Sequence, residues 1–321
     1  MTSGIRRLCV PFALSVALAA QQPPTIQTNV HLVLVPATVT DRKGNFIDGL
    51  NPGDFLVTDD GVKQNFHLDT SDTVLAPVSL VVAVECSGIS AAVLAKINRV
   101  GSLIQPLVAG DRGRAAVIAF DDEVRVFQPF TSDGSKIRAA FERIQPRVIR
   151  KGKMLDAVAE SVKLLETQPE NRRRVLIILS ESRDRGSKMK LAGAMELVER
   201  AGVMVYPATY SIYATPWTAK PEDNPPVPGS SVDGLVDLLR LGKENTAEAL
   251  ARATGGRHLS FETLKGLEES IIRAGEEIHS QYLLSFVPVQ PGKQYHHIEV
   301  MIPKRTGAIV RARPGYWPAA N

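Results

Sequence analysis

Residues 81–90 read VVAVECSGIS, and this stretch decides the fold that the sequence predicts. An unbroken apolar run is typical of a parallel strand that is covered on both faces of its sheet. The run ends at Glu85, and small polar residues with a glycine follow it. We therefore expect a buried strand whose carboxyl end opens into a loop with oxygen atoms suited to an ion.

Similar apolar runs recur along the middle of the chain and alternate with segments of helical spacing. RAAVIAF, RVLIILS and VMVYPATYS read as further buried strands, whereas EVRVFQPF alternates like an edge strand. Apolar residues at helical spacing occur between them, in residues 90–108, 134–144, 154–166 and 191–201. Strands that alternate with helices predict an α/β fold of the Rossmann type, with a doubly wound, mostly parallel sheet flanked by helices.

Short strands flank this α/β region at both ends of the chain. Residues 26–72 alternate apolar and polar side chains between turn signals, and residues 280–318 hold three more strand patterns. Each set is too small to bury a sheet alone. We therefore expect one β-sandwich built from both ends, with the α/β domain, residues 75–279, inserted into it. A proline-rich stretch at residues 213–235 predicts a surface loop in that domain.

The first 20 residues have the pattern of a secretory signal peptide. Arg6 and Arg7 precede a short apolar segment, and small residues near Ala19 and Ala20 offer a cleavage site. The apolar segment is too short to span a bilayer comfortably, and an uncleaved anchor is the alternative. Cleavage predicts a secreted or periplasmic protein with no stable membrane span. Its remaining cysteine, Cys86, has no partner for an internal disulfide.

Oxygen-bearing side chains follow several of the predicted strands. In doubly wound sheets, ligands bind in the crevice at the carboxyl ends of the strands. The candidates are Glu85, Ser87 and Ser90 after the first run, Asp121 and Asp122 after the second, Ser180, Glu181 and Asp184 after the third, and Asp156 at a helix entry. We expect these side chains to share one face of the domain.

Four longer segments add a family resemblance to this pattern. They are TDRKGNFIDGLNPGDFLVTDDGVKQ, RLGKENTAEALARATGG, SQYLLSFVP and VRARPGYW. With them, the whole chain resembles the bacterial secreted proteins described as VWFA-related. The core resembles a von Willebrand factor type A domain, with its apolar strand, acid-x-Ser start and later Ser-acid strand end. The resemblance implies a metal-ion-dependent adhesion site at the strand ends.

The adhesion site of that family needs Asp-x-Ser-x-Ser on the first strand end, a Thr before a helix and an Asp on a later strand end. By position, these ligands fall on Glu85, Ser87, Ile89, Gly152 and Glu181. Only the first Ser is retained. Glu85 and Glu181 are each longer than Asp by one methylene, and Ile89 and Gly152 have no side-chain oxygen. Mg²⁺ demands near-ideal octahedral geometry and tolerates little misfit. We therefore expect a degenerate site that holds no metal and no other cofactor.

Two other arrangements of these residues stay open. Glu85, Ser87, Ser90 and Glu181 could form a rebuilt weak site with waters, in which Glu85, Ser87 and Glu181 are the metal ligands. Ca²⁺ would suit such a site better than Mg²⁺, because Ca²⁺ accepts looser geometry. Alternatively, Lys153 could neutralise Glu85 and Glu181 in place of an ion.

The histidines show no metal-binding spacing. His31, His67 and His258 are isolated in the sequence. His296 and His297 are consecutive in a predicted strand, so their side chains point to opposite faces and cannot chelate together. We expect structural or surface roles for all of them.

These features predict an exported, non-catalytic binding or adhesion module whose ligand is a protein or a cell-envelope component. The expected ligand-binding face comprises Glu85, Ser87, Ser90, Asp121, Asp122, Gly152, Lys153, Glu181 and Asp184. One alternative is a weak Ca²⁺- or Mg²⁺-dependent binder at the same face.

A thiol or carboxylate hydrolase that uses Cys86, or Glu85 with Glu181, is the other alternative. Nothing in the sequence orients a base toward the cysteine, so we expect no enzyme activity. Nucleic acid is not an expected partner, because the basic residues behind the net charge of +4 are scattered and not interleaved with aromatic residues. The sequence does not indicate an oligomeric state.

Overall fold

The structure is a computed structural model that describes residues 32–69, 77–87, 94, 97, 101–107, 113–149, 151–169, 172–210, 245–288 and 295–318. By compactness the chain divides into Met1–Val30 and His31–Asn321, and every described residue lies in the second unit. The predicted signal peptide, Ile89, Ser90 and the loop at residues 213–235 lie outside the described residues. Among the described residues, no helix combines the length and the apolar character that crossing a bilayer requires.

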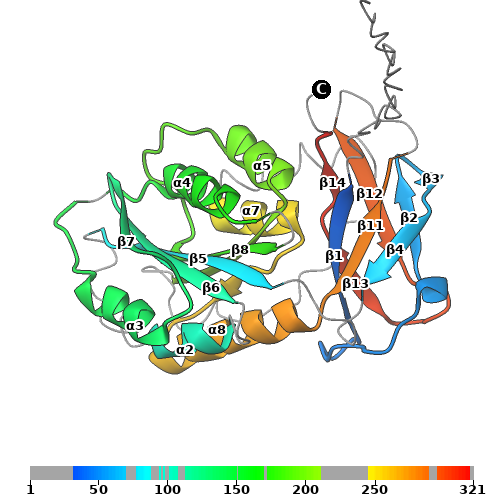
Figure 1. The fold of residues 1–321 in the computed structure, drawn as a ribbon, viewed down its shortest axis with the longest axis horizontal. Coiled ribbons are helices and arrows are strands. Elements are labelled where there is room, and N and C mark those ends of the chain that lie inside the picture. Colours follow the sequence, from blue (N-terminus) through cyan, green and yellow to red (C-terminus); the bar gives the residue numbers. More distant parts are fainter. Residues whose placement is uncertain are drawn as a thin grey trace, which may run out of the picture. The chain divides into compact units, whose positions relative to one another are not determined.

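A six-stranded sheet forms the centre of the α/β region (Figure 1). Its strands, in spatial order, are β10 (Leu259–Ser260), β9 (Val203–Tyr210), β8 (Arg173–Glu181), β5 (Val78–Glu85), β6 (Arg114–Phe120) and β7 (Val124–Thr131). Neighbouring strands are parallel except for β7, which pairs antiparallel with β6 at the edge. Every residue of the central strand β5 is buried, as its unbroken apolar run predicts.

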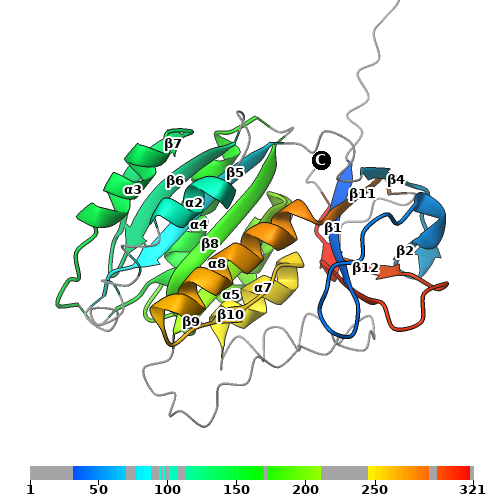
Figure 2. The same cartoon turned by 90° about the horizontal axis from the view of Figure 1, so that it is seen from below.

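Helices cover both faces of this sheet (Figures 1 and 2). One face packs against α2 (Gly101–Leu107), α3 (Gly134–Arg143) and α8 (Leu264–His279). The other packs against α4 (Met154–Glu166), α5 (Leu191–Arg200) and α7 (Thr246–Thr254). Residues along β5 alternate between the two cores, since side chains of a strand point to opposite faces.

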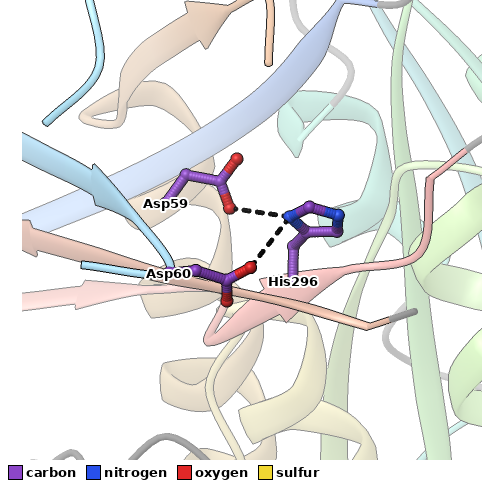
Figure 3. A group of neighbouring side chains, drawn as sticks. All are labelled: Asp59, Asp60 and His296. Carbon is purple, nitrogen blue, oxygen red and sulfur yellow. Dashed lines mark hydrogen bonds and ion pairs between the residues drawn. The ribbon is translucent and has the colours of Figure 1, made fainter. Parts of the chain in front are cut away.

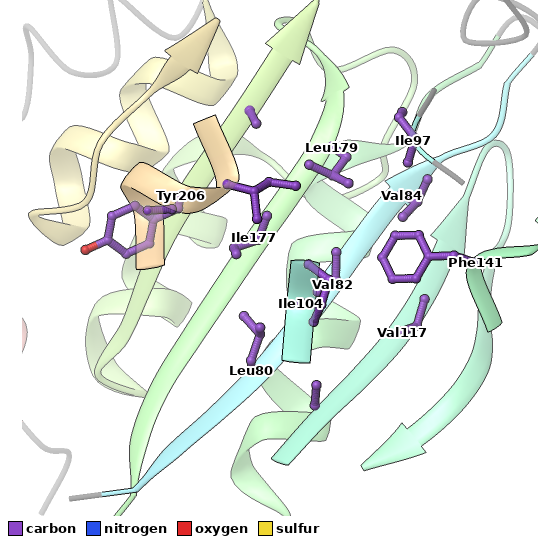
Figure 4. Close-up of a cluster of buried hydrophobic side chains, with 14 of the residues drawn as sticks. Leu80, Val82, Val84, Ile97, Ile104, Val117, Phe141, Ile177, Leu179 and Tyr206 are labelled. Carbon is purple, nitrogen blue, oxygen red and sulfur yellow. The ribbon is translucent and has the colours of Figure 1, made fainter. Parts of the chain in front are cut away.

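The first of these cores contains Leu80, Val82 and Val84 of β5, which meet Ile104 and Phe141 of the covering helices (Figure 4). The second contains Val81 and Ala83. A mostly parallel sheet with helices on both faces confirms the predicted fold class.

Two four-stranded sheets are built from the remaining strands (Figure 2). One has the order β13 (Ile309–Ala312), β1 (Val33–Thr40), β11 (Tyr282–Phe286) and β4 (Phe66–Asp69). The other has the order β14 (Gly315–Tyr316), β12 (His296–Met301), β2 (Leu56–Asp59) and β3 (Val62–Lys63). Each sheet combines strands from both ends of the chain, and both contribute to one apolar core that includes Val35, Val57, Leu284 and Ile298.

Two stretches of these terminal strand regions are each divided between the two sheets. The segment from Val62 to Leu68 forms β3 and then β4, and the last strand pattern forms β13 and then β14. The second break falls at Pro314, which lacks the N–H that a continuous ladder needs. Its carbonyl oxygen instead accepts a hydrogen bond from Ile298 of β12, at 2.9 Å. The chain therefore changes sheets at this proline.

A buried carboxylate, that of Glu277 on α8, binds two arginines. Glu277 is 0% exposed. Its Oε2 lies 2.8 Å from Nε of Arg257, and its Oε1 pairs with Arg311 of β13. Burial alone would raise the pKa of Glu277, but the charges of Arg311 and Arg257 outweigh burial and hold the pKa below its usual range. The Glu277–Arg311 ion pair connects α8, which covers the parallel sheet, to β13 of the neighbouring sheet.

Replacement of this carboxylate should destabilise the protein strongly. We expect Glu277→Gln to lower the free energy of unfolding by about 3–5 kcal/mol, because loss of the buried carboxylate leaves the charges of two partly buried arginines uncompensated. Urea denaturation of the purified chain measures the change.

The matched control is Glu142→Gln, since Glu142 pairs with Arg138 at 4.0 Å and both side chains are more than 60% exposed. We expect this control to change stability by less than about 1 kcal/mol.

Because the folded-state pKa of Glu277 is lowered, its contribution to the free energy of unfolding is present above its ordinary pKa of 4.5 and is lost as the pH falls below that value. Equal losses in the two variants at neutral pH would contradict the assignment.

Candidate functional site at the strand ends

The carboxylate of Glu85 lies at the end of β5, where the strand ends meet. Glu85 is 2% exposed. Its Oε2 accepts a hydrogen bond from the backbone N–H of Glu181 on β8 at 2.8 Å, and its Oε1 accepts one from the Ser87 hydroxyl at 2.6 Å. Glu85 therefore joins the ends of two neighbouring parallel strands through its side chain.

Burial and charge change the acidity of this group. Burial raises the pKa of Glu85 above its usual range, and the nearby charge of Glu181 raises it further, although the bonds from Ser87 and from the Glu181 N–H act in the opposite direction. Glu85 therefore takes up a proton more readily than an ordinary glutamate.

Gly152 faces the Glu85 carboxylate from the loop before α4. A Cβ atom on Gly152 would lie 2.4 Å from Oε1 of Glu85, so the Glu85 side chain or the loop would have to shift to make room for it. The carbonyl of Gly152 accepts a hydrogen bond from the backbone N–H of Arg185 at 2.9 Å, so the two loops are joined here. With Glu85 in its present position, the side chain that the adhesion-site pattern expects at position 152 overlaps the carboxylate.

A guanidinium group neutralises the second acid of the site. Glu181, 5% exposed, accepts a hydrogen bond from Nε of Arg185 at 2.6 Å, and a second nitrogen of the same guanidinium bonds the other carboxylate oxygen. Such a bidentate pair is among the stronger interactions of charged side chains. Lys153, considered for this role from the sequence, makes no ion pair with Glu85 or Glu181 in the structure, and Arg185 makes the pair with Glu181 instead.

Asp121 and Asp122 form a separate group with two arginines. Asp121 is fully buried, and its Oδ2 lies 2.8 Å from Arg125 and 3.3 Å from Arg147. Although burial alone would raise the pKa of Asp121, the hydrogen bond from the Glu123 N–H, the interaction with the Asp122 side chain and the charges of Arg125 and Arg147 lower it. Asp122 lies 3.8 Å from Arg147. Both carboxylates are thus engaged by arginines.

Cys86 lies against the same group. Its sulfur is 3.2 Å from a nitrogen of Arg125 and 3.5 Å from Oδ2 of Asp121. Burial, and then the charge of Asp121, raise the pKa of the Cys86 thiol to about 12. The side chain is therefore a buried thiol at neutral pH and not the thiolate that nucleophilic attack requires.

Asp184 and Asp156 fasten the loop after β8 to helix α4. Oδ1 of Asp184 accepts a hydrogen bond from the backbone N–H of Leu155 at 3.1 Å, in the first turn of α4. Oδ1 of Asp156 accepts hydrogen bonds from the N–H groups of Lys188 and Met189 at 3.0 and 2.9 Å. Both acids hold backbone groups, which accounts for their positions without an ion.

The structure thus brings four of the predicted residues together, namely Glu85, Ser87, Gly152 and Glu181. Asp121 and Asp122 are held by their own arginines, and Asp184 holds a helix. Arg185 was not predicted. The signal for it was weak, namely an arginine four residues after Glu181 in a loop with no periodic pattern.

The contact between Gly152 and Glu85 gives a direct test of this geometry. We expect Gly152→Ala to lower the free energy of unfolding by about 1–3 kcal/mol, because the new methyl overlaps the Glu85 carboxylate. The double variant Gly152→Ala with Glu85→Asp should lose less than the sum of the single changes, because the shorter acid makes room. Urea denaturation of the four proteins of this cycle measures the coupling.

Gly53→Ala is the matched control, since no atom lies within 4 Å of the added Cβ at that position. It should alter stability by less than about 0.5 kcal/mol. Strictly additive losses for Gly152→Ala and Glu85→Asp would show that the two residues do not compete for the same space.

The comparison with family models agrees with this fold. Residues 68–183 match the family model described as von Willebrand factor type A domain. None of the curated proteins gives a significant match. Among solved structures, an aerotolerance-related membrane protein from Bacteroides fragilis NCTC 9343 is 16% identical, with a TM-score of 0.45 over 62% of this chain and 98% of its own.

Two further solved structures give similar values. The conserved hypothetical protein BatB from Bacteroides thetaiotaomicron is 16% identical, with a TM-score of 0.44 over 62% of this chain and 99% of its own. A von Willebrand factor type A protein from Catenulispora acidiphila is 10% identical, with a TM-score of 0.47 over 84% of this chain and 76% of its own. At these values the structural matches carry no argument. The family match is limited to residues 68–183, which are similar to a von Willebrand factor type A domain.

Proposed function

We propose that this chain is a non-catalytic binding module that binds its ligand at the strand-end face without a metal ion. The observation that carries the proposal is the Glu181–Arg185 pair beside the buried Glu85 carboxylate. A bound Mg²⁺ needs several well-placed oxygens and free negative charge. Here Arg185 engages Glu181, and Gly152 supplies no side-chain oxygen.

The rim of this face suggests the chemistry of the ligand. Lysines from two adjoining loops lie there, namely Lys151 and Lys153 before α4 and Lys188 and Lys190 before α5. The loops adjoin because Lys151 packs close to Gly186, whose added Cβ would lie 3.7 Å from the Lys151 Cδ.

The acids of these loops offset only part of that positive charge. Residues 151–156 and 181–190 hold four lysines and two arginines against three acids, Asp156, Glu181 and Asp184. Arg185 pairs with Glu181, and none of the four lysines forms an ion pair with an acid among the described residues. Unpaired lysines at a solvated rim attract anionic partners. We therefore favour an acidic ligand, either a protein segment or an anionic cell-envelope component.

Two observations support a binding role over hydrolysis. The Cys86 thiol is buried and its pKa is raised to about 12. The carboxylates of Glu85 and Glu181 are both engaged in hydrogen bonds.

The proposal also includes export, which rests on the signal-peptide pattern of residues 1–20, outside the described part of the chain.

Capture from envelope fractions tests the proposed face. The mature protein should retain an acidic component, and a variant with Lys151, Lys188 and Lys190 changed to Ala should bind about tenfold more weakly. Three solvated charges at about 0.5 kcal/mol each give that factor. Binding should also weaken as the salt concentration rises, because salt screens exposed charges.

A matched variant changes three exposed lysines elsewhere, Lys43, Lys136 and Lys265, to Ala and should bind like the native protein. Treatment of the fraction with protease before capture separates a protein ligand from an envelope polymer. Equal capture by both lysine variants, without salt dependence, would place the binding surface elsewhere.

A further inference from the structure

Three side chains converge on one point in the two-sheet part of the molecule, apart from the strand-end face (Figure 3). Asp59 ends β2, Asp60 follows it in the turn to β3, and His296 begins β12, the strand that pairs with β2. Nδ1 of His296 lies 3.1 Å from Oδ1 of Asp59 and 3.1 Å from Oδ2 of Asp60. The three atoms all lie within 4.8 Å of one another.

A second layer of contacts orients these groups. The Tyr316 hydroxyl donates a hydrogen bond to the other oxygen of Asp59 at 3.0 Å, and the backbone N–H of His297 donates one to the other oxygen of Asp60 at 2.9 Å. The ring of His296 stacks on the ring of Tyr316, with 5.0 Å between their centroids. Each carboxylate therefore has one oxygen fixed by the protein and one directed at the imidazole, as in metal sites whose ligands are held by outer partners.

The charge at this point is unbalanced. Two carboxylates face one ring nitrogen, and that nitrogen carries at most one hydrogen to share between them. Neither Asp59 nor Asp60 pairs with a lysine or an arginine among the described residues, and the ion pairs recorded for them are those with His296. A cation held between the three groups would satisfy both carboxylates at once.

The cluster is open to solvent on one side. Asp59 is 5% exposed and His296 7%, whereas the side chain of Asp60 is 49% exposed. An ion can therefore enter past Asp60, and water can fill the remaining coordination positions.

We propose that Asp59, Asp60 and His296 bind one divalent transition-metal cation of the Zn²⁺ class, with water as the remaining ligand. Zn²⁺ binds imidazole nitrogen and carboxylate oxygen at about 2.0–2.2 Å, which places tetrahedral ligands roughly 3.3 Å apart. The observed N–O separations of 3.1 Å need only a small outward shift. A ligand set that includes imidazole favours such metals over Mg²⁺ and Ca²⁺.

The bound ion would connect two distant parts of the chain. Asp59 and Asp60 come from the N-terminal strands, and His296 is 237 residues from Asp59 in the sequence. An ion here would brace the turn between β2 and β3 against β12, which gives it a stabilising role in this sheet.

Titration calorimetry of the metal-free, full mature protein with Zn²⁺ tests the proposal. We expect one site per chain, and Asp60→Asn and His296→Gln should each weaken it at least tenfold. Asp60 adopts a left-handed backbone conformation, with φ of 48°, and asparagine tolerates that conformation well, so Asp60→Asn should keep its fold. Circular dichroism checks this, and the visible spectrum of the Co²⁺-substituted protein reports the ligand set.

Three control variants separate this site from other metal-binding groups. His297→Gln removes the neighbouring histidine, His67→Gln removes an exposed histidine that pairs with Asp69, and Glu181→Gln alters the strand-end face. All three should bind Zn²⁺ like the native protein. No Zn²⁺ binding, or binding that survives both Asp60→Asn and His296→Gln, would overturn the proposal and leave contacts between the imidazole and the two acids as the explanation of the cluster.

Discussion

The buried carboxylate of Glu85 sets the arrangement of the strand-end face. It bonds the N–H of Glu181 across two parallel strands, and it occupies the space into which any side chain at position 152 would project. Gly152, which has no side chain, therefore leaves room for the longer acid at position 85. The Gly152 carbonyl accepts a hydrogen bond from the backbone N–H of Arg185. The position of Gly152 therefore also fixes the loop from which the Arg185 guanidinium reaches Glu181.

These features form one set of interactions that depend on one another. A longer acid fills the centre, a glycine gives it room, and an arginine balances the second acid. The three residues depend on one another, because buried charges must be paired and buried polar groups must be hydrogen-bonded. In the proposed metal-free site, Arg185 and the lysines of the adjoining loops take the place of the positive charge that an ion would bring.

Local pattern was sufficient to predict the α/β fold, since β5 is an unbroken apolar run and the helical segments between the strands show apolar periodicity. The strand-end position of Glu85, Ser87 and Glu181 followed from the topology of a parallel sheet. The partners of these groups could not be predicted in the same way. Arg185 reaches Glu181 within an irregular loop, and His296 meets Asp59 across 237 residues of sequence. Neither contact has a period or a spacing that sequence alone reveals.

The melting temperature of the metal-free native protein, measured with and without millimolar Mg²⁺, tests most directly whether the strand-end site works without a metal. A competent site at a hundred times its Kd would add about 2.7 kcal/mol to the folded state. We predict no Mg²⁺-dependent rise, because Glu181 is already paired with Arg185 and Gly152 contributes no side-chain oxygen. A clear rise that Glu181→Ala abolishes would contradict this and show that the strand ends hold a working metal site.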